Sequence, residues 1–384
     1  MSALTMQRPR SSAEAAGALA EFLRGRGPDI EAAGRLPGDV ATALRTSGLL
    51  RLLMPRVLGG DGGDWQSAFD AIETVARADG STGWSLMIGM TINMLAGYVE
   101  RDEALELFSG SAPLFLAGVF EPRGVGRRDG ADTKFRVSGR WRFATGVHLS
   151  DWFCATAAVP TDTGQEVRHF IVPTKALTIH PNWNVIGLSG TGSDDVELDS
   201  IAVDRRRSFT LDDTPWPDEP FWHVSFYMVT ALLMAAALLG MTRGGIETVL
   251  AKGASPGGSL SRFGRNQCLE VEVATAEASV RAARAFVLEC MNEIEASIRK
   301  GTPPSERQRA LLWLAGIHCA RSCGEALDLL FSGEGASGIR RDSPLQRSWR
   351  DVRAAGKHVV VARQRLEAVG RVLLGSPSDA KPFL

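Results

Sequence analysis

One histidine, His358, lies among basic and apolar residues near the end of the chain, in the stretch PLQRSWRDVRAAGKHVVVARQRLEAVGRVLLG. An imidazole titrates near neutral pH and can therefore donate and accept a proton within one reaction cycle. The apolar residues of the stretch recur at three- and four-residue or heptad intervals, which predicts one long helix from Pro344 to Gly375. On such a helix, Ala354 and Ala355 share a face with His358, so a flat ligand could approach the imidazole.

Basic residues surround this histidine in the sequence: Arg347, Arg350, Arg353, Lys357 and Arg363. When the stretch is taken alone, a structural histidine in a basic, solvated helix is therefore the favoured interpretation. Whether a ligand could reach the imidazole depends on the elements upstream.

The composition is that of a folded globular chain. Its 384 residues could form two or three domains, with 44% hydrophobic and 23% charged residues. A net charge of −1 predicts no general attraction to nucleic acid or to an anionic membrane, so we expect a small-molecule partner. The five cysteines are scattered without a CxxC pair, and we predict no metal site. Because there is no signal-peptide pattern and no apolar run of membrane length, we expect a cytoplasmic location.

The period of the apolar residues changes twice along the chain. Up to about residue 110 the pattern is helical, including Asp64–Asp79, capped by Asp64, and Ser81–Tyr98, capped by Ser81. Short β-branched or aromatic runs separated by turn residues then predict strands: Leu114–Phe120, Lys134–Ser138, Arg140–Thr145, Trp152–Val159, His169–Val172, Leu177–His180 and Asp195–Val203.

Helical periodicity returns after a polar connector. It covers Phe221–Ala251, Gln267–Lys300, Pro304–Ser332 and the last stretch, which predicts four long antiparallel helices. We therefore expect an α+β fold in three parts. These are an N-terminal helical domain (1–110), a small central β domain (111–208) and a C-terminal four-helix bundle (209–384).

Several motifs occur in an order that resembles the acyl-CoA dehydrogenase superfamily over essentially the whole chain. They are Asp79-Gly80-Ser81-Thr82-Gly83-Trp84, Glu121-Pro122, Gly139–Gly146 (GRWRFATG) with Asp151-Trp152, Gly187–Ser193 (GLSGTGS) with Asp195-Val196, Gly335-Ala336-Ser337-Gly338 and Trp349-Arg350-Asp351. Each motif is weak by itself, and their order and spacing make the likeness strong. The resemblance implies the three-part α-β-α architecture and a flavin cofactor.

The resemblance and the residue chemistry together suggest where a flavin would bind. The strand Phe143-Ala144-Thr145 can offer a ring, backbone amides and a hydroxyl, although it could also be a plain core strand. Trp141 is two residues from Phe143, which predicts the same sheet face for both, either in the cavity or in the core. The candidate cofactor-binding residues are Trp141, Phe143, Ala144, Thr145, Ser189, Thr191, Ser193, Arg262 and Ser337.

Some of these assignments have a simple alternative. The glycine-rich turn around Ser189 and Thr191 could serve chain geometry alone, and Arg262, which the resemblance implies could reach a neighbouring subunit's cofactor, could be an ordinary surface residue. Four residues are candidates for the substrate pocket, with core packing as the alternative: Trp84, Asn93, Phe120 and Trp183.

One departure from the superfamily pattern separates two activities. The dehydrogenases commonly carry a glutamate base eight positions after the Asp of the Arg-Asp pair, and that position here is Val359, which cannot accept a proton. Glu247 lies on another predicted helix and is a possible replacement. The neighbouring His358 instead gives the stretch a resemblance to the group D two-component flavin-dependent monooxygenases, carried by Gln346, Arg347, Trp349, Arg350, Asp351, His358, Gly370, Arg371, Leu373, Leu374 and Gly375.

That resemblance implies a specific set of partners. Reduced FMN or FADH2 would come from a separate NAD(P)H:flavin reductase and react with O2 to a C4a-(hydro)peroxyflavin, which hydroxylates or N/S-oxidises a small, aromatic or amine-bearing metabolite. His358 would be the catalytic residue, and the protein would be a homotetramer. The chain carries no GxGxxG motif in a βαβ unit, which agrees with flavin reduction on a partner. The alternatives are an FAD-dependent acyl-CoA dehydrogenase-like desaturase and a non-catalytic helical binding or assembly protein.

Overall fold

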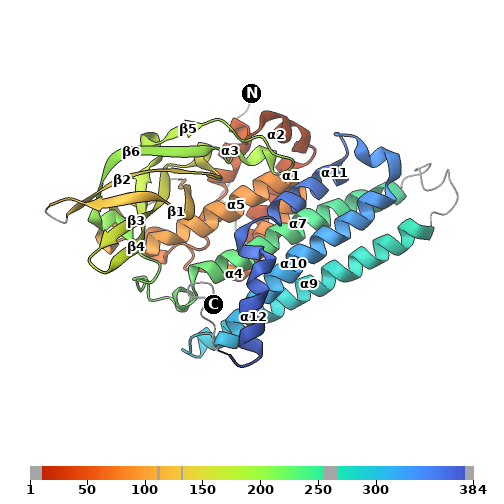
Figure 1. Cartoon of the computed structure of the whole chain (residues 1–384). Helices are drawn as coiled ribbons and strands as arrows, with labels where there is room; N and C mark the ends of the chain where they lie inside the picture. Colours follow the sequence, from red (N-terminus) through yellow and green to blue (C-terminus); the bar gives the residue numbers. More distant parts are fainter. Residues whose placement is uncertain (1–10, 110–112, 131–132, 255–266, 377–384) are drawn as a thin grey trace.

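The computed structural model describes residues 11–109, 113–130, 133–254 and 267–376 (Figure 1). The chain begins with the helices α1 (Ser12–Leu23), α2 (Gly27–Ala33), α3 (Gly38–Thr46), α4 (Trp65–Ala78), α5 (Gly80–Asn93) and α6 (Arg101–Phe108). The expected cap of α5 at Ser81 is wrong. The carboxylate of Asp79 accepts the backbone N–H of Thr82 at 2.7 Å, so α5 begins at Gly80.

A seven-stranded sheet follows, formed by β1 (Leu116–Arg128), β2 (Lys134–Trp141), β3 (Trp152–Thr161), β4 (Gly164–Pro173), β5 (Thr178–His180), β6 (Asp195–Asp204) and β7 (Ser208–Phe209). The strand order is β5-β6-β2-β1-β3-β4-β7, and only the β1–β3 pair among these is parallel. The run Lys134–Ser138 and the first residues of the run Arg140–Thr145 form one strand, β2, because a register shift near Gly139 lets the chain continue to Trp141.

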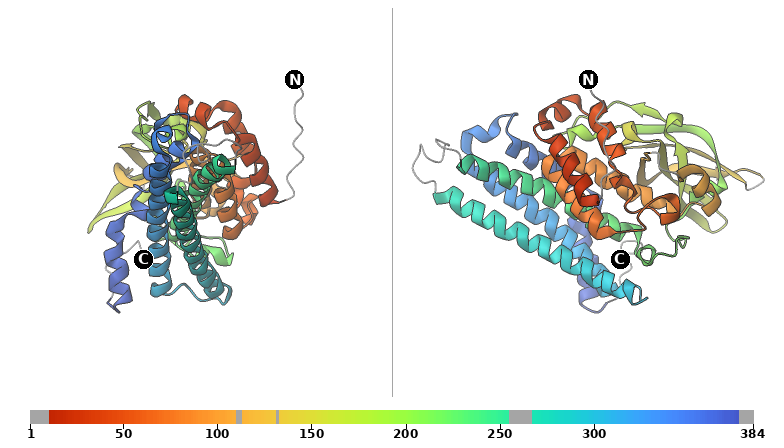
Figure 2. Two further views of the ribbon diagram at one scale, coloured as in Figure 1. Left: turned by 90° about the vertical axis from the view of Figure 1, so that its right-hand side faces the viewer. Right: turned by 180° about the vertical axis from the view of Figure 1, so that it is seen from behind.

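Three long helices build the C-terminal part: α7 (Phe226–Ala254), α9 (Gln267–Arg299) and α10 (Glu306–Gly333). They run side by side in both views of Figure 2, and α10 packs against both α7 and α9. Their expected positions are confirmed to within a few residues. By length and composition the span Phe226–Gly253 could cross a membrane, but 89% of its most apolar window is buried, as in the core helix of a globular protein.

The expected single helix from Pro344 to Gly375 is wrong. It consists of α11 (Pro344–Ala355), 3-10 turns at Val359–Val361 and Arg363–Arg365, and α12 (Leu366–Leu373), packed along α10 (Figure 1). Glycine costs about 1 kcal/mol in a helix interior, and α11 ends at Gly356. Because α11 and α12 each bury one face, the apolar spacing continues across the break between them. The sequence pattern therefore could not reveal this break.

Helix α5 is the central element of the molecule. It contacts α4 and α7 on one side and β1 on the other, and it lies between the sheet and the long helices in Figure 1. Every residue of α5 except Ile88 is buried. A helix that is apolar on all sides must be enclosed by other elements, and this one joins the sheet to the bundle.

Candidate functional site

His358 lies in the extended connector between α11 and the first 3-10 turn. Its backbone angles are φ −65° and ψ 138°, and its Nδ1 accepts the N–H of Val360 at 3.2 Å. The neutral ring therefore carries its proton on Nε2. Although the residue as a whole is half-buried, burial of the ring and then the nearby charge of Arg365 lower the pKa of His358 to about 4. The direction of this shift keeps the imidazole neutral at pH 7.

The ring of His358 meets the indole of Trp84 on α5. The ring centroids are 5.9 Å apart and the planes are inclined by 64°. Ile88 follows Trp84 by one helical turn and therefore lies on the same face. Since Ile88 is the one partly exposed residue of α5, this face borders a space that solvent can enter. The contact between Trp84 and the histidine supports the predicted pocket role of Trp84.

An aromatic cluster lies between β1 and the start of α7. The Phe120 ring is 4.6 Å from Phe226 and 6.4 Å from Tyr227, and it approaches His169 at 5.4 Å. The Arg365 guanidinium stacks on a bundle tryptophan, and its charge acts on both Tyr227 and His358. Phe120 was predicted from the sequence as a pocket residue, whereas Phe226 and Tyr227 were not. The adjacent aromatic pair at the start of a long apolar helix was the available signal.

Val359 and Glu247 are the two positions at which a dehydrogenase could carry its glutamate base, and neither places a base beside His358. Val359, at the expected position, has a side chain that is 62% exposed. Glu247 on α7 accepts a hydrogen bond from Arg77 Nε at 2.7 Å and forms an ion pair with it. Glu247 is therefore engaged by Arg77, and the titratable ring that contacts Trp84 is that of His358.

The segment Phe143-Ala144-Thr145 was expected to be part of a strand, but the strand ends before it. Trp141 ends β2 and is fully buried, with its indole N–H donated to the Thr156 carbonyl at 2.8 Å. Phe143 is 61% exposed and has φ 65°, a backbone region that costs a non-glycine residue about 1–2 kcal/mol. Trp141 and Phe143 therefore do not share a face, because the chain leaves the sheet after Trp141. An exposed aromatic side chain on strained backbone suits a ligand-binding role.

Three buried hydroxyls form a continuous row beside this segment. Thr145 Oγ1 lies 2.8 Å from Ser193 Oγ, which lies 2.8 Å from Thr191 Oγ1. Thr191 Oγ1 donates to the Leu188 carbonyl at 2.8 Å. The row connects the segment after β2 to the glycine-rich turn, so the structure brings together residues that are nearly fifty positions apart in the sequence.

Two other candidates lie close to this row. Trp183 donates its indole N–H to the Leu188 carbonyl at 3.1 Å, and its ring is 6.1 Å from that of Phe143. Ser189 is half-buried, and its hydroxyl donates to the Val185 carbonyl at 3.4 Å. Trp183 therefore belongs with the exposed Phe143 rather than with Trp84 and Phe120.

Asn93 has a structural role, and its expected place in the substrate pocket stays a prediction. The side chain is fully buried, and its amide donates to the carbonyls of Leu50 and Leu114 and accepts the N–H of Leu116. With these hydrogen bonds made, Asn93 ties α5 to β1 and to the loop at Leu50. Arg262 lies outside the residues that the structure describes, and so does the side chain of Ser337.

The residues on the sheet side fit a flavin. An isoalloxazine needs a flat apolar surface together with hydroxyls and backbone amides near its polar edge. Phe143 supplies an exposed ring and Trp183 a half-buried one, and the hydroxyl row with the Ala144 and Thr145 backbone supplies the polar groups. Within the described parts of the chain, no group of three or more His, Cys, Asp or Glu side chains is arranged to hold a metal ion.

Models of one protein family match both ends of the chain. The N-terminal domain of acyl-CoA dehydrogenase matches residues 12–101, and its C-terminal domain matches residues 232–363.

Curated relatives align along nearly the whole length. The chain is 26% identical over 387 residues to the indole-3-acetate monooxygenase of Pseudomonas putida, with 98% of each chain covered. It is 27% identical over 386 residues to the oxygenase component of an FADH2-dependent resorcinol hydroxylase from a Rhizobium species, covering 95% of this chain and 93% of the relative.

A solved structure shows the same fold. The HsaA monooxygenase from Mycobacterium tuberculosis superposes with a TM-score of 0.89 at 23% identity, covering 97% of this chain and 100% of that chain. The expected architecture of an N-terminal helical part, a central sheet and C-terminal helices is confirmed.

Proposed function

The chain belongs to the acyl-CoA dehydrogenase superfamily, and we propose that it is the oxygenase component of a two-component flavin-dependent monooxygenase. The observation that carries this proposal is the neutral His358 beside Trp84, next to Val359, the position where a dehydrogenase commonly carries its glutamate. The indole-3-acetate monooxygenase and the resorcinol hydroxylase component, each similar to almost the whole chain, support the same activity.

The cofactor is reduced FAD or FMN, with O2 as co-substrate. Bound reduced flavin supplies two electrons, and one atom of O2 enters the substrate while the other leaves as water. On this chain, Phe143 and Trp183 would contact the ring system, while Thr145, Ser193 and Thr191 would bind its polar edge. The Phe143 ring, on its strained backbone, is already exposed to solvent without a ligand.

We assign to His358 the role of a hydrogen-bond donor to an oxygen atom in the active site. Because its Nδ1 is occupied by the Val360 N–H, the Nε2 proton is free to be donated to an oxygen atom in the active site. A neutral imidazole can donate this proton in a hydrogen bond over the whole physiological pH range, since its pKa is lowered to about 4. Trp84 packs against the ring from the α5 side and so orients it.

The substrate we propose is a small aromatic compound. Phe120, Phe226 and Tyr227 form an aromatic wall whose edge-to-face and tilted contacts suit a planar ring. The names of both relatives point to aromatic substrates for those proteins. We further propose a separate NAD(P)H:flavin reductase as partner, a homotetrameric assembly and a cytoplasmic location.

The experiment that tests this function uses purified protein and chemically or enzymatically reduced flavin. Oxygen-dependent conversion of an indole or phenol, followed with labelled O2 so that one labelled atom appears in the product, is the expected result. Under anaerobic conditions, bleaching of bound oxidised FAD by an acyl-CoA thioester would instead support a desaturase. Failure to bind flavin in either redox state would support a non-catalytic binding protein.

A further inference from the structure

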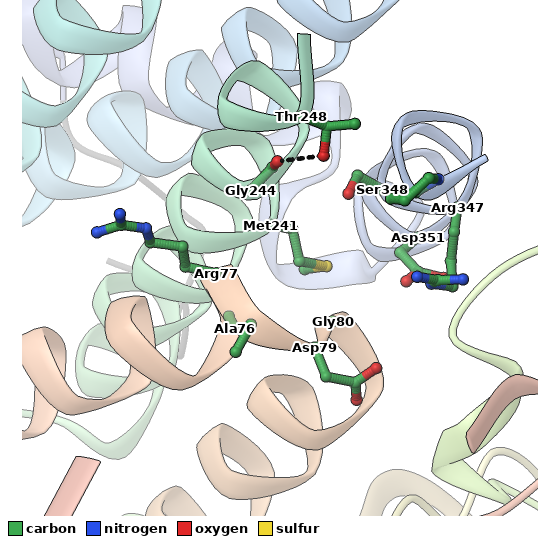
Figure 3. A pocket seen from close by; sticks show the side chains of 12 residues that line it. Ala76, Arg77, Asp79, Gly80, Met241, Gly244, Thr248, Arg347, Ser348 and Asp351 are labelled. Carbon is green, nitrogen blue, oxygen red and sulfur yellow. Dashed lines mark hydrogen bonds between the residues drawn. The ribbon is translucent and has the colours of Figure 1, made fainter. Parts of the chain in front are cut away.

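A small polar cavity lies on the far side of the glycine-rich turn, where α4 and α5 meet α7 and α11. It encloses about 100 Å³, and Figure 3 shows Asp79, Met241, Arg347 and Asp351 around it. The side chains of Asp79 and Asp351 are both buried, with 5% of each residue exposed. Burial of two carboxylates beside one cavity lowers the stability of a fold, so we expect these two residues to have a specific role.

Asp351 connects the bundle to the glycine-rich turn. Its Oδ1 accepts the backbone N–H of Leu188 at 2.6 Å, a short bond that joins α11 to the turn. Leu188 has φ 56°, and a Cβ atom on Gly187 would lie only 2.2 Å from the Arg350 carbonyl oxygen. The turn therefore lies directly on the backbone of α11, in a conformation that its residues would not adopt without this contact.

The other carboxylate oxygen of Asp351 faces α5. A Cβ atom on Gly80 would approach Oδ2 to 2.7 Å, so the carboxylate fills the space that a side chain would need there. Asp79, next to Gly80, uses its Oδ1 to cap α5 through both the N–H and the hydroxyl of Thr82. Asp351 is thus wedged between the start of α5 and the turn.

Several charged groups face this pair from the surrounding elements. Arg347 and Arg350 come from α11, and Arg350 is paired at 2.6 Å with Glu31 of α2. Arg77 of α4 also lines the cavity and is paired with Glu247. Burial raises the pKa of Asp351 to about 7, the charge of Asp79 adds to this, and the Leu188 N–H and the two arginines of α11 oppose it. Burial also raises the pKa of Asp79.

The effect of Asp351 extends to the flavin side through a chain of short contacts. Leu188, held by Asp351, accepts the hydroxyl of Thr191 at 2.8 Å. Thr191 in turn lies 2.8 Å from Ser193, the middle member of the hydroxyl row. Each member of the row is fixed by the next, so a shift of the turn moves every hydroxyl that we assign to flavin binding.

We propose that Asp351 is a positioning residue for the flavin, which holds the Gly187–Thr191 turn and thereby the hydroxyl row in the binding geometry. This inference rests on the proposed function. An ionised carboxylate accepts a stronger hydrogen bond from a backbone N–H than a neutral acid or amide does. Below a pH of about 7 Asp351 carries a proton, and above it the carboxylate is charged and holds the turn more firmly. Asp351 thus also makes flavin affinity depend on pH.

The first test needs no flavin. Amide hydrogen exchange of the peptide that contains Leu188 is measured in the wild type, Asp351→Asn and Asp351→Ala. Asparagine keeps an acceptor oxygen of the same shape and alanine has none. At pH 6, where the wild-type carboxyl is largely protonated, we expect exchange in Asp351→Ala to be faster by roughly tenfold, as for loss of one hydrogen bond, and exchange in Asp351→Asn to be close to that of the wild type. Equal protection in the wild type and Asp351→Ala would overturn the proposal.

The second test measures the Kd for reduced flavin by anaerobic titration between pH 6 and pH 8. The ratio of the Asp351→Asn and wild-type values is used, because ionisation of the flavin itself cancels in it. We expect this ratio to rise from close to one at pH 6 to about fivefold at pH 8, as the wild-type carboxylate becomes charged. A ratio that stays flat over this range would contradict the proposal.

Glu31→Gln is the matched control. This change removes the carboxylate partner of Arg350, and with it the ion pair that connects α11 to α2, but it leaves the Asp351–Leu188 hydrogen bond in place. Its Kd ratio should not vary with pH, and a rise like that of Asp351→Asn would mean that general loosening of α11 is the cause. A wild-type protein that binds no reduced flavin would refute the proposed function, while the exchange experiment would still decide whether Asp351 holds the turn.

Discussion

Trp84 and His358, 274 positions apart in the sequence, meet with their ring centroids 5.9 Å apart and their planes inclined by 64°. The indole comes from the buried central helix α5, and the imidazole from the connector that follows α11. An edge-to-face contact of this kind adds about 0.5–1.5 kcal/mol beyond burial for aromatic pairs. It gives the imidazole a fixed orientation although its own segment is not helical.

Replacing His358 with alanine should lower product formation by about 100-fold or more, because removing one positioned hydrogen-bond donor from an active site costs about 10²–10³ in kcat. Reduced-flavin binding and the melting temperature should change little. The measurement is substrate turnover with excess reduced flavin and O2. His180→Ala is the control, since His180 of β5 is hydrogen-bonded to Glu197 of β6 at 2.8 Å, away from this site. Unchanged turnover in His358→Ala would remove the assigned role.

The lowered pKa of His358 predicts a loss of stability in acid. The folded protein binds no proton at this ring until the pH approaches 4, whereas the unfolded chain binds one near 6.5, so stability should fall as the pH drops through this window. His358→Asn should lose less stability between pH 7 and pH 5 than the wild type, by about 1–2 kcal/mol. Denaturant unfolding at both pH values measures this difference. The same loss in both proteins would show that the ring is not held neutral.

Phe143→Gly should stabilise the protein and weaken flavin binding at the same time. Glycine adopts φ 65° without strain, so relief of about 1 kcal/mol is expected, while the exposed ring is lost. Thermal unfolding and a flavin titration measure the two effects. Ser200→Gly is the matched control, because Ser200 has φ 53° on exposed backbone of β6 and should give only the gain in stability. Tighter or equal flavin binding in Phe143→Gly would contradict the assignment.

Thr145→Ala should weaken reduced-flavin binding by about three- to tenfold, the effect of one lost hydrogen bond. The buried Ser193 keeps Thr191 as a partner, so the fold should be retained. Ser150→Ala removes a similar hydroxyl contact, to Thr174 at 2.8 Å, and serves as control. If both variants bind flavin with the same affinity as the wild type, the hydroxyl row is structural only.

The sequence predicted the fold well because its signals are local. The change from helical to alternating apolar spacing and back identified the sheet and the three long helices, and the motif order identified the superfamily. The prediction of a single helix failed at Gly356, because α11 ends there although the apolar spacing continues beyond this glycine. It also misplaced the cap of α5, because Asp79 and Ser81 are both good capping residues and only the backbone direction decides between them.

The site was only partly predictable, since it depends on contacts between distant segments. His358 and the members of the hydroxyl row could be named from motifs, but not the order in which Thr145, Ser193 and Thr191 bond to one another. Trp141 and Phe143 were expected on one face because a strand alternates strictly, and the chain leaves the strand between them. The bond from Asp351 to Leu188 spans 163 positions and has no local signature.

The break at Gly356 makes the connector that carries His358 tolerant of changes in length. In an unbroken helix, each inserted residue would turn everything after it by about 100° and shift it by about 1.5 Å. Here α11 is fixed through Asp351 and α12 through its own buried face, so an insertion between them would be absorbed in the 3-10 turns. Chains of this architecture could therefore re-aim the imidazole toward differently shaped substrates, by natural variation or by engineering, without repacking the bundle.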